Sequence, residues 1–385
     1  MRATYDCLVI GCGFAGAVIA REMAERGGKK VLVIEKRDHI GGGAYDLYDD
    51  NGILIHQYGP HIFHTNNNRV FDYLSRFTQF RAYAHEVLAD VHGQLIPVPF
   101  NLNALHIAFE PQKARILEEK LTGAYGAGRR VTISELREQP DPDIAQVAEY
   151  VYNNIFLHYT QKQWGVSPDE IDPSVTARVP ILISRDNRYF QDSYQGLPSE
   201  GYTRLFERML DHENIEVQCN TDAADMIRVQ AEAVTFNGAP FSGPVIYTGA
   251  IDALFDYRFG RLPYRTLDFL FETHDRTWYQ PKGTVNYTVD KPYTRITEFK
   301  HLTGQELDGK TTIMKEYPKE YKGAPGETPY YPIANPENHR LYETYKAAAQ
   351  SIPCFYLLGR LAEYKYYNMD GVIERALTLA DNIVG

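Results

Sequence analysis

The segment "GCGFAG", residues 11–16, lies between an apolar run, "YDCLVI", and a stretch with apolar residues at helical spacing, "AGAVIAREMAERGGK". Glycines in the pattern Gly-x-Gly-x-x-Gly between a strand and a helix form a dinucleotide-binding turn. Gly11 permits the tight turn, Gly13 lets a pyrophosphate approach the backbone, and Gly16 allows the helix to pack closely on the strand. The spacing predicts an α/β chain that begins with a Rossmann-like, doubly wound sheet.

The next strand, "KVLVIEKR", ends at an acidic residue, Glu35. A carboxylate at this place can accept both ribose hydroxyls and disfavours a 2′-phosphate, so FAD or NAD is preferred over NADP. A second glycine cluster, "HIGGGAY", follows within a few residues. A plain NAD enzyme has no need of two such turns, whereas an extended FAD runs on past the first, so the pair favours FAD.

Composition limits the other classes of function. A chain of 385 residues predicts two or three domains, and its formal charge of −10 argues against a nucleic-acid binder. No apolar run is long enough to span a membrane, and the N-terminus leads directly into a strand without a signal-peptide pattern. Four scattered cysteines lack metal spacing and are expected to be reduced. We expect a cytoplasmic protein without a metal.

Two further segments carry candidate site residues. "YGPHIFHT" holds His61 and His64, which lack a third metal ligand, so they lie either beside a cofactor or in the core. "HYTQKQWG" places Tyr159, Thr160 and Trp164 at a helix end, where they form either a binding face or part of a core. The sequence alone leaves both pairs of alternatives open.

The rest of the chain predicts a domain organisation. A helical insertion domain is expected next, then a region of short β-like runs that predicts an antiparallel β-sheet domain. The proline-rich segment near 166–186 is predicted to be a mobile loop. The expected domains are a discontinuous FAD-binding domain at 1–80, 195–252 and 345–385, a helical domain at 81–190, and a sheet domain at 253–344.

Read as a whole, the chain resembles the bacterial UDP-galactopyranose mutases. The resemblance runs in order over nearly the entire sequence, so it is far more specific than the glycine pattern. It is carried by "GCGFAGAV", "VLVIEKRDHIGGGAYD", "YGPHIFHT", "YTQKQWG", "YFQDSYQGLPSEGYTRL", "YTGAIDALFDYRFGRLPYRTL", "YTRITEFKH", "EYP", "PYYPI" and "GRLAEYKYYNMD".

The resemblance implies reversible isomerisation of UDP-galactopyranose and UDP-galactofuranose without net redox change. Reduced FAD (FADH⁻) would act through N5 as a nucleophile at the anomeric carbon, displacing UDP, which later adds back. It also implies an external reductant such as NAD(P)H, a homodimer, and a role in supplying galactofuranose for cell-surface glycans.

The resemblance also implies which residues hold each group. Arg178 and Arg295 would neutralise the pyrophosphate, and His64 would lie beside the flavin. Cofactor-binding positions would be Gly11, Gly13, Ala15, Gly16, Glu35, Lys36, Gly42, Gly43, His61, Ile62, Arg360, Met369, Asp370, Gly371 and Val372. Substrate-binding positions would be His85, Ile155, Phe156, Tyr159, Thr160, Trp164, Tyr189, Arg265, Asn286, Tyr331, Tyr366 and Asn368.

The chain departs from the family pattern at three of its positions. Gly43 stands where an asparagine is usual, His85 where some members have an asparagine, and Ile155 where an aromatic residue often helps to hold uracil. Two rival functions share the FAD opening: a flavin-dependent amine or alcohol oxidase, and a non-catalytic flavoprotein that binds nucleotide sugars. The oxidase would require an apolar substrate cavity rather than arginines set among tyrosines, and turnover would eliminate the binding protein.

Overall fold

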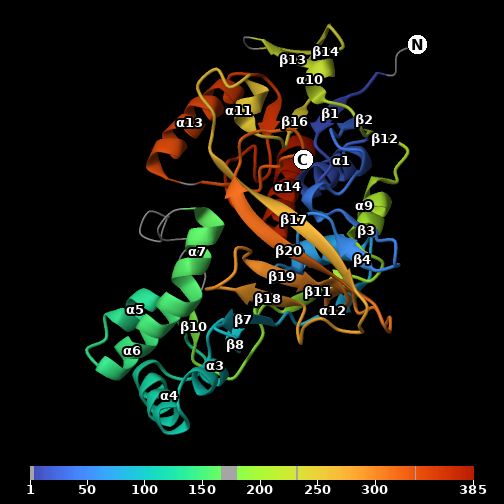
Figure 1. Cartoon of the computed structure of the whole chain (residues 1–385). Coiled ribbons are helices and arrows are strands. Elements are labelled where there is room, and N and C mark those ends of the chain that lie inside the picture. Colours follow the sequence, from blue (N-terminus) through green and yellow to red (C-terminus); the bar gives the residue numbers. More distant parts are fainter. Residues whose placement is uncertain (1–3, 166–179, 231–232, 334) are drawn as a thin grey trace. The chain divides into compact units, whose positions relative to one another are not determined.

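The computed structural model describes residues 4–165, 180–230, 233–333 and 335–385. The chain divides into two compact units (Figure 1). Unit 1 comprises Met1–Ala82, Asp192–Tyr264 and Tyr321–Gly385, and unit 2 comprises Tyr83–Gln191 and Arg265–Glu320. The segments predicted as a helical domain and as a sheet domain both contribute to unit 2.

A five-stranded parallel sheet forms the centre of unit 1. Its strands are short, and all but the edge strand β12 are apolar, as expected for a sheet that is covered on both faces. The non-consecutive order is that of a doubly wound sheet, which confirms the predicted α/β fold. The order across the sheet is β12 (Ile215–Gln218), β2 (Val31–Ile34), β1 (Cys7–Ile10), β16 (Val245–Tyr247) and β22 (Phe355–Leu357).

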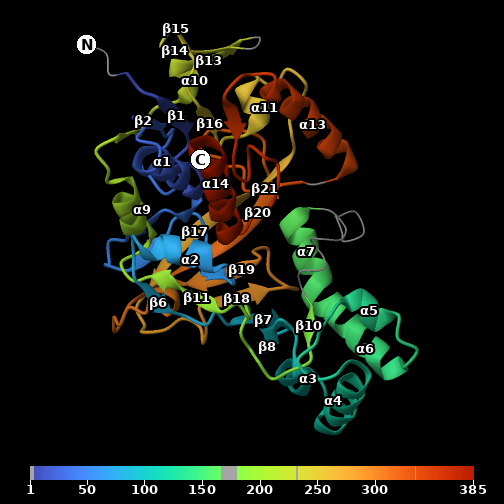
Figure 2. The ribbon, with the colours of Figure 1, turned by 180° about the vertical axis from the view of Figure 1, so that it is seen from behind.

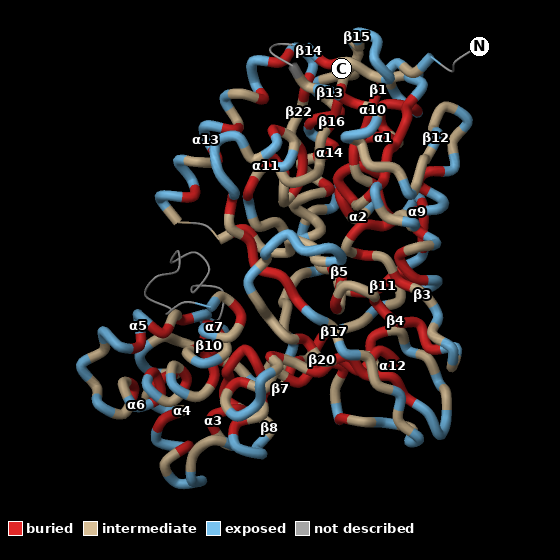
Figure 3. Tube along the Cα trace, turned by 45° about the horizontal axis from the view of Figure 1, so that its top comes forward, coloured by how far each residue is buried: buried red, intermediate tan, exposed pale blue. Residues whose placement is uncertain are grey.

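Alternate residues of β1 enter two different hydrophobic cores, because successive side chains of a strand point to opposite faces. Cys7 and Val9 pack with the helices α1 (Phe14–Glu25), α2 (Asn68–Ser75), α9 (Tyr202–Leu210) and α14 (Met369–Val384). Leu8 and Ile10 pack with α11 (Ile251–Leu254) and α13 (Pro336–Gln350). Figure 2 shows α14 beside α1, and Figure 3 shows how thoroughly β1 and α1 are buried.

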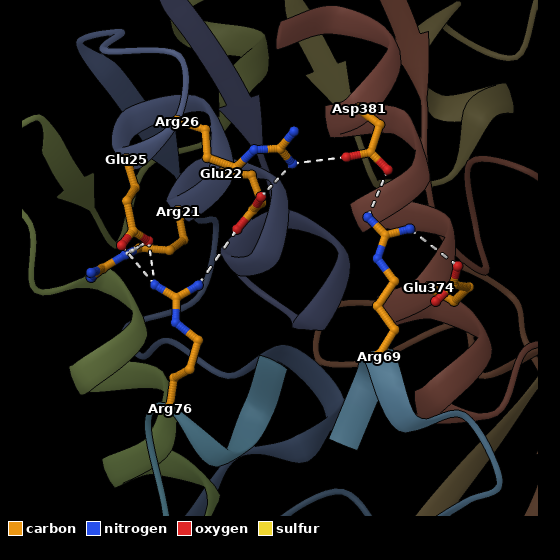
Figure 4. A network of polar contacts seen from close by, with 8 residues as sticks. All are labelled: Arg21, Glu22, Glu25, Arg26, Arg69, Arg76, Glu374 and Asp381. Atoms are coloured by element: carbon orange, nitrogen blue, oxygen red, sulfur yellow. Dashed lines mark hydrogen bonds and ion pairs between the residues drawn. The ribbon is translucent and has the colours of Figure 1, made fainter. Parts of the chain in front are cut away.

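Ion pairs join α1, α2 and α14 on the outside of this layer (Figure 4). Glu22 pairs with Arg26 at 2.9 Å, Arg26 pairs with Asp381 at 2.8 Å, and Arg69 reaches Asp381 at 2.6 Å and Glu374 at 3.4 Å. Single exposed pairs contribute little, but a chain of them restrains all three helices at once. The helices that surround the glycine turn are therefore also linked by charge.

Smaller elements complete unit 1. The strands β5 and β6 pair with β11, β3 pairs with β4, and β14 lies between β13 and β15. Their bounds are β3 (Asp46–Tyr48), β4 (Leu54–His56), β5 (Phe63–Thr65), β6 (Phe80–Ala82), β11 (Tyr194–Pro198), β13 (Ile227–Gln230), β14 (Ala233–Phe236), β15 (Ala239–Phe241), β21 (Tyr331–Pro332), η1 (Gly42–Ala44) and α10 (Ala223–Met226).

Unit 2 is built on a mixed sheet. Neighbouring strands are antiparallel except β18 and β7, which run parallel. The order is β17 (Tyr264–His274), β20 (Thr311–Glu320), β19 (Arg295–Glu298), β18 (Thr284–Tyr287), β7 (Val87–Val91) and β8 (Gln94–Val98). The short helix α12 (Phe299–Thr303) follows β19.

Helices cover the β7–β8 end of this sheet. Val87, Ala89, Ile96 and Val98 form one core with apolar residues of the helical segment. Among the described residues, no helix of either unit combines the length and the apolar character needed to cross a bilayer. The helical segment contains α3 (Leu102–Ala108), α4 (Pro111–Tyr125), β9 (Arg130–Val131), α5 (Ile133–Arg137), α6 (Pro142–Val151), a π-helical turn η2 (Tyr152–Phe156), α7 (Leu157–Trp164) and β10 (Ile181–Leu182).

Candidate active site

The first glycine turn of unit 1 has no room for side chains. Gly11 has φ of +98°, and a Cβ on Gly16 would lie 1.9 Å from the carbonyl oxygen of Gly11. Gly13 is the N-cap residue of α1 and provides no side-chain cap. The turn is therefore tightly packed, and the N–H groups at the start of α1 are of the kind that binds an anion.

The second glycine cluster packs directly against the first. Gly42 has φ of +56°, and a Cβ there would lie 2.8 Å from the Cα of Gly13. The N–H of Gly41 donates to the carbonyl oxygen of Cys12 at 2.9 Å. A Cβ on Gly43 would lie 3.8 Å from Nε2 of His61, so this histidine is the next neighbour. The two clusters thus form one cradle.

Glu35 lies at the end of β2 and is 5% exposed. Its Oε2 accepts the N–H of Cys12 at 2.7 Å, and its Oε1 accepts the N–H of Arg37 at 2.9 Å. These bonds orient the carboxylate, and each oxygen keeps a lone pair for a hydroxyl donor. The Glu35 carboxylate is therefore oriented so that it can accept hydrogen bonds from ribose hydroxyls. The ammonium of the neighbouring Lys36 points to solvent, 3.4 Å from Asp222, and not to the glycine turn.

Three histidines lie in and after β4 and in β5, and one of them, His61, is beside the cradle. The N–H of His61 donates to Nδ1 of His56 at 3.0 Å, and Nδ1 of His61 donates to the carbonyl oxygen of Gly59 at 2.8 Å. Burial lowers the pKa of both rings to about 4, so both are neutral near pH 7. His64, in β5, donates from Nδ1 to a carboxylate oxygen of Asp192 at 2.9 Å. Ile62 lies buried between the two predicted histidines.

The C-terminal segment brings a cation and two phenol rings together. Arg360 donates to the carbonyl oxygen of Tyr367 at 2.7 Å, and its guanidinium lies 4.9 Å from the ring centroid of Tyr366. The ring of Tyr366 is stacked on that of Tyr331, with 5.9 Å between centroids. Three predicted residues therefore form one cluster, although Tyr331 is distant from the others in sequence.

The first turn of the helix α14, in unit 1, contains an acidic residue, and the N–H of Gly371 donates to Oδ1 of Asp370 at 2.8 Å. Asn368 is its N-cap and makes no side-chain cap bond. Asp370, in the first turn, accepts the hydroxyl of Thr65 at 2.9 Å, which ties this helix end to β5. The remaining predicted cofactor positions lie in this region: Met369, Gly371 and Val372 are in the same helix, and Ala15 contacts the turn at Gly359.

In unit 2, Arg295 lies between a strand and a helix. Its Nη2 donates to the hydroxyl of Tyr159 on α7 at 2.8 Å, and its Nε lies 3.3 Å from a carboxylate oxygen of Glu316 on β20. Asn286, on β18, is the cross-strand neighbour of Arg295. The structure therefore brings Tyr159, Asn286 and Arg295 together, as the resemblance implies.

Arg265 has a defined structural contact. Its guanidinium donates to the carbonyl oxygens of Gln163 at 3.0 Å and Lys162 at 3.1 Å, at the C-terminal end of α7. A positive charge there satisfies orphan carbonyls and opposes the negative end of the helix dipole. Thr160 is buried on the same helix, and Trp164 is its last residue. Arg265 thus holds the helix that carries three predicted substrate residues.

The remaining predicted substrate positions of unit 2 are largely buried. Tyr189 donates its N–H to the carbonyl oxygen of His85 at 2.7 Å, and the two rings meet edge to face. Ile155 and Phe156 lie in the π-helical turn η2 and belong to the hydrophobic core of this unit. Arg178 lies outside the described residues.

Two carboxylates near these residues escaped the sequence reasoning. Asp192 bonds His64, and Glu316 pairs with Arg295. The signal for Glu316 was present in "TTIMKEYP", because an acidic residue at an inward position of a strand is rare without a partner. Asp192 lies in an irregular segment, where no periodicity reveals its direction.

The chain is similar to two known protein families. Residues 154–366 match the model of the UDP-galactopyranose mutase family, and residues 9–77 match that of an NAD(P)-binding Rossmann-like domain. The UDP-galactopyranose mutase of Mycoplasma pneumoniae is 35% identical over 99% of this chain and 96% of its own length. A probable UDP-galactopyranose mutase of Klebsiella pneumoniae is 37% identical, covering 98% and 94%.

A relative with a different substrate in its name is equally similar. The dTDP-fucopyranose mutase of Escherichia coli is 36% identical over 97% of both chains. A crystal structure of reduced UDP-galactopyranose mutase covers 100% of this chain and 94% of its own, with a TM-score of 0.75 at 18% identity, which supports the fold alone. The resemblance seen in the sequence is confirmed: this chain belongs to the UDP-galactopyranose mutase family and is an enzyme of the isomerase class.

Proposed function

We propose that this enzyme interconverts UDP-galactopyranose and UDP-galactofuranose with reduced FAD and without net redox change. The observation that carries the proposal is full-length membership of the mutase family, together with the retained arginine–tyrosine pair of Arg295 and Tyr159. The amine and alcohol oxidase alternative has no comparable support.

The cradle in unit 1 fits FAD. Gly16 and Gly42 let the helix and the second glycine cluster pack directly on the first turn, and Gly13 at the start of α1 leaves the backbone open to a pyrophosphate. Glu35 is oriented to accept ribose hydroxyls, and Arg360 supplies a positive charge. The N-terminus of α14 would favour a negative charge on a reduced flavin ring. When bound, the reduced flavin would supply the nucleophile for the anomeric carbon.

The chain's own task is to hold the nucleotide and to stabilise the departing diphosphate. In unit 2, Arg295 would form charge-assisted bonds with the phosphates, a role that Arg178 would share. In unit 1, the hydroxyls of Tyr331 and Tyr366 would donate to phosphate oxygens. Fixed donors of this kind lower the barrier because they are already oriented when negative charge develops on the leaving group.

Relatives of this chain are named for two different sugar nucleotides. The UDP-galactopyranose and dTDP-fucopyranose mutases are equally similar to this chain, and this chain departs from the usual pattern at His85 and Ile155. We propose the UDP-galactose pair because the family model is that of the UDP-galactopyranose mutases. We further propose a cytoplasmic homodimer, reduced by NAD(P)H, that supplies galactofuranose for cell-surface glycans.

The test is chromatographic conversion of UDP-galactofuranose to UDP-galactopyranose by the flavin-loaded protein, oxidised and dithionite-reduced side by side. Conversion in the reduced sample alone supports the proposal. A parallel assay with the dTDP-fucose pair decides the substrate: faster conversion of that pair would reassign it. Absence of conversion of either pair by a folded, flavin-loaded and reduced protein would overturn the assignment.

A further inference from the structure

Glu316 occupies an unusual position for a carboxylate. It lies in the interior strand β20 and is 2% exposed. In cross-strand register it is directly opposite Arg295 on β19, and Arg295 is directly opposite Asn286 on β18. Directly opposite residues share one face of a sheet, so the three form a polar row. Ala89 and Phe269 continue the row on the flanking strands, so the polar part has apolar ends.

The carboxylate and a phenol hydroxyl hold one guanidinium from two sides. On the side of the sheet, a carboxylate oxygen of Glu316 lies 3.3 Å from Nε of Arg295. On the side of α7, the hydroxyl of Tyr159 accepts a hydrogen bond of 2.8 Å from Nη2. The contact at Nε is an ion pair rather than a hydrogen bond, so Glu316 attracts the guanidinium by charge from the sheet side, while the hydrogen bond at Nη2 gives it direction. The opposite charge of Arg295 also counteracts the burial that raises the pKa of Glu316.

Several oxygens on this face are buried without a hydrogen-bond partner among the described residues. They are Oε1 of Glu316, Oδ1 of Asn286, and the hydroxyls of Thr284 and Thr297, which are cross-strand neighbours one step along the same face. Buried polar atoms in native proteins are almost always satisfied. Unsatisfied oxygens beside an arginine indicate a face built for a polar ligand that carries both hydroxyl donors for the oxygens and an anionic group for Arg295, rather than for packing.

A buried ion pair with an unsatisfied oxygen is a poor device for stability. Removing two charges from water costs more than their attraction returns unless the remaining lone pairs are satisfied. Apolar residues of similar volume would serve the sheet at least as well. The presence of Glu316 is therefore better explained by what it does to Arg295 than by what it does for the fold.

We propose that Glu316 is a positioning residue for anion binding, which acts through Arg295 by holding its guanidinium in place from the sheet side. The identity of the anion as the diphosphate of a sugar nucleotide rests on the proposed function. The position of the Glu316 carboxylate does not depend on the proposed function, because it follows from the cross-strand register and from the contact with Arg295.

The experiment uses the FAD-loaded full chain with Glu316→Gln and Glu316→Ala. Glutamine keeps the volume and an acceptor oxygen for Nε, so it should retain part of the effect; alanine should not. The matched control is Glu272→Gln. Glu272 on β17 pairs with Lys315 on β20 at 2.7 Å. Its cross-strand neighbour is Ile313, three residues before Glu316, so the side chain of Glu272 lies on the other face of the sheet from Glu316.

We expect Glu316→Ala to lower kcat/KM about a hundredfold and Glu316→Gln about tenfold, with Glu272→Gln close to wild type. Because Glu316→Gln leaves the guanidinium of Arg295 without its counter-charge, its apparent melting temperature should fall below that of the wild type, and kcat/KM is measured at a temperature at which every variant is folded. Equal kcat/KM for the wild type and both Glu316 variants would overturn the inference, as would losses that merely follow a lower melting temperature.

A second readout separates this inference from the proposed function. UDP affinity is measured by calorimetric titration for Glu316→Ala, Arg295→Ala and the double variant. If Glu316 acts through Arg295, the double variant should bind UDP no more weakly than Arg295→Ala alone. Additive losses, or no UDP binding by the wild type, would refute the positioning role. A non-additive cycle in a protein without mutase turnover would support the positioning role while the proposed function fails.

Discussion

The buried His56 makes the stability of unit 1 sensitive to mild acid. His56 lies in β4, is 1% exposed, and accepts the N–H of His61 at its Nδ1. Burial lowers its pKa from 6.5 to about 4. Protonation would place a charge in the core and remove the acceptor that holds residue 61, one of the predicted cofactor contacts.

The sign follows from proton linkage. Because the pKa of His56 is lower in the folded chain than in the unfolded chain, the unfolded chain binds more protons between these two values. The contribution of His56 to the free energy of unfolding is therefore fully present above pH 6.5 and is lost as the pH falls towards 4. Between these values, linkage predicts a loss of about 2 kcal/mol at pH 5 and about 3 kcal/mol at pH 4, relative to neutral pH. Against a typical total of about 5–15 kcal/mol, this is a large fraction.

The assay is urea unfolding at pH 7, 6, 5 and 4.5, followed by circular dichroism and by release of bound flavin, which reports on unit 1. His56→Asn keeps an acceptor oxygen for the N–H of His61 but does not titrate. We expect the variant to be less stable at pH 7, yet to lose about 2 kcal/mol less than the wild type between pH 7 and pH 5.

The control replaces an exposed histidine at a position where asparagine fits. His92 has φ of +53° and an exposed ring, so His92→Asn should follow the wild-type pH dependence. If the stability curves of His56→Asn and the wild type run parallel from pH 7 to pH 4.5, His56 does not carry the effect and the reasoning is wrong.

Three further predictions concern the glycine cradle and the two arginines of unit 2. Gly16→Ala should abolish flavin binding, measured as the ratio of flavin absorbance to protein, because its Cβ would lie 1.9 Å from the Gly11 oxygen; Gly123→Ala, on open helix surface, should retain full flavin. Arg295→Ala should keep the flavin but lose at least about a hundredfold in turnover, and loss of flavin instead would show that the site is misplaced. Arg265→Lys should lower stability by about 1–2 kcal/mol in urea unfolding, because lysine cannot bond both α7 carbonyls as a planar fork. If Arg265→Lys changes only the KM, Arg265 contacts substrate rather than α7.

The sequence by itself determined the nucleotide-binding turn and the family. Gly11, Gly13 and Gly16 are close in the chain, and each meets a requirement of a single strand–turn–helix unit, so their spacing reveals the structure. Glu35 ends the next strand, and strand ends can be read from the pattern of apolar residues. The order of the longer segments identified the family, which a local pattern could not do.

Only the tertiary structure decided which distant residues meet. Gly42 touches Gly13 because a loop folds back on the first turn, and no periodicity in the sequence encodes that return. Arg265 caps α7, and Glu316 lies beside Arg295, because of the pairing of β17, β19 and β20. Cross-strand register depends on which strands pair and on where each begins, and a shift of one residue would turn Glu316 to the other face. Such partners become visible only when the whole sheet has formed.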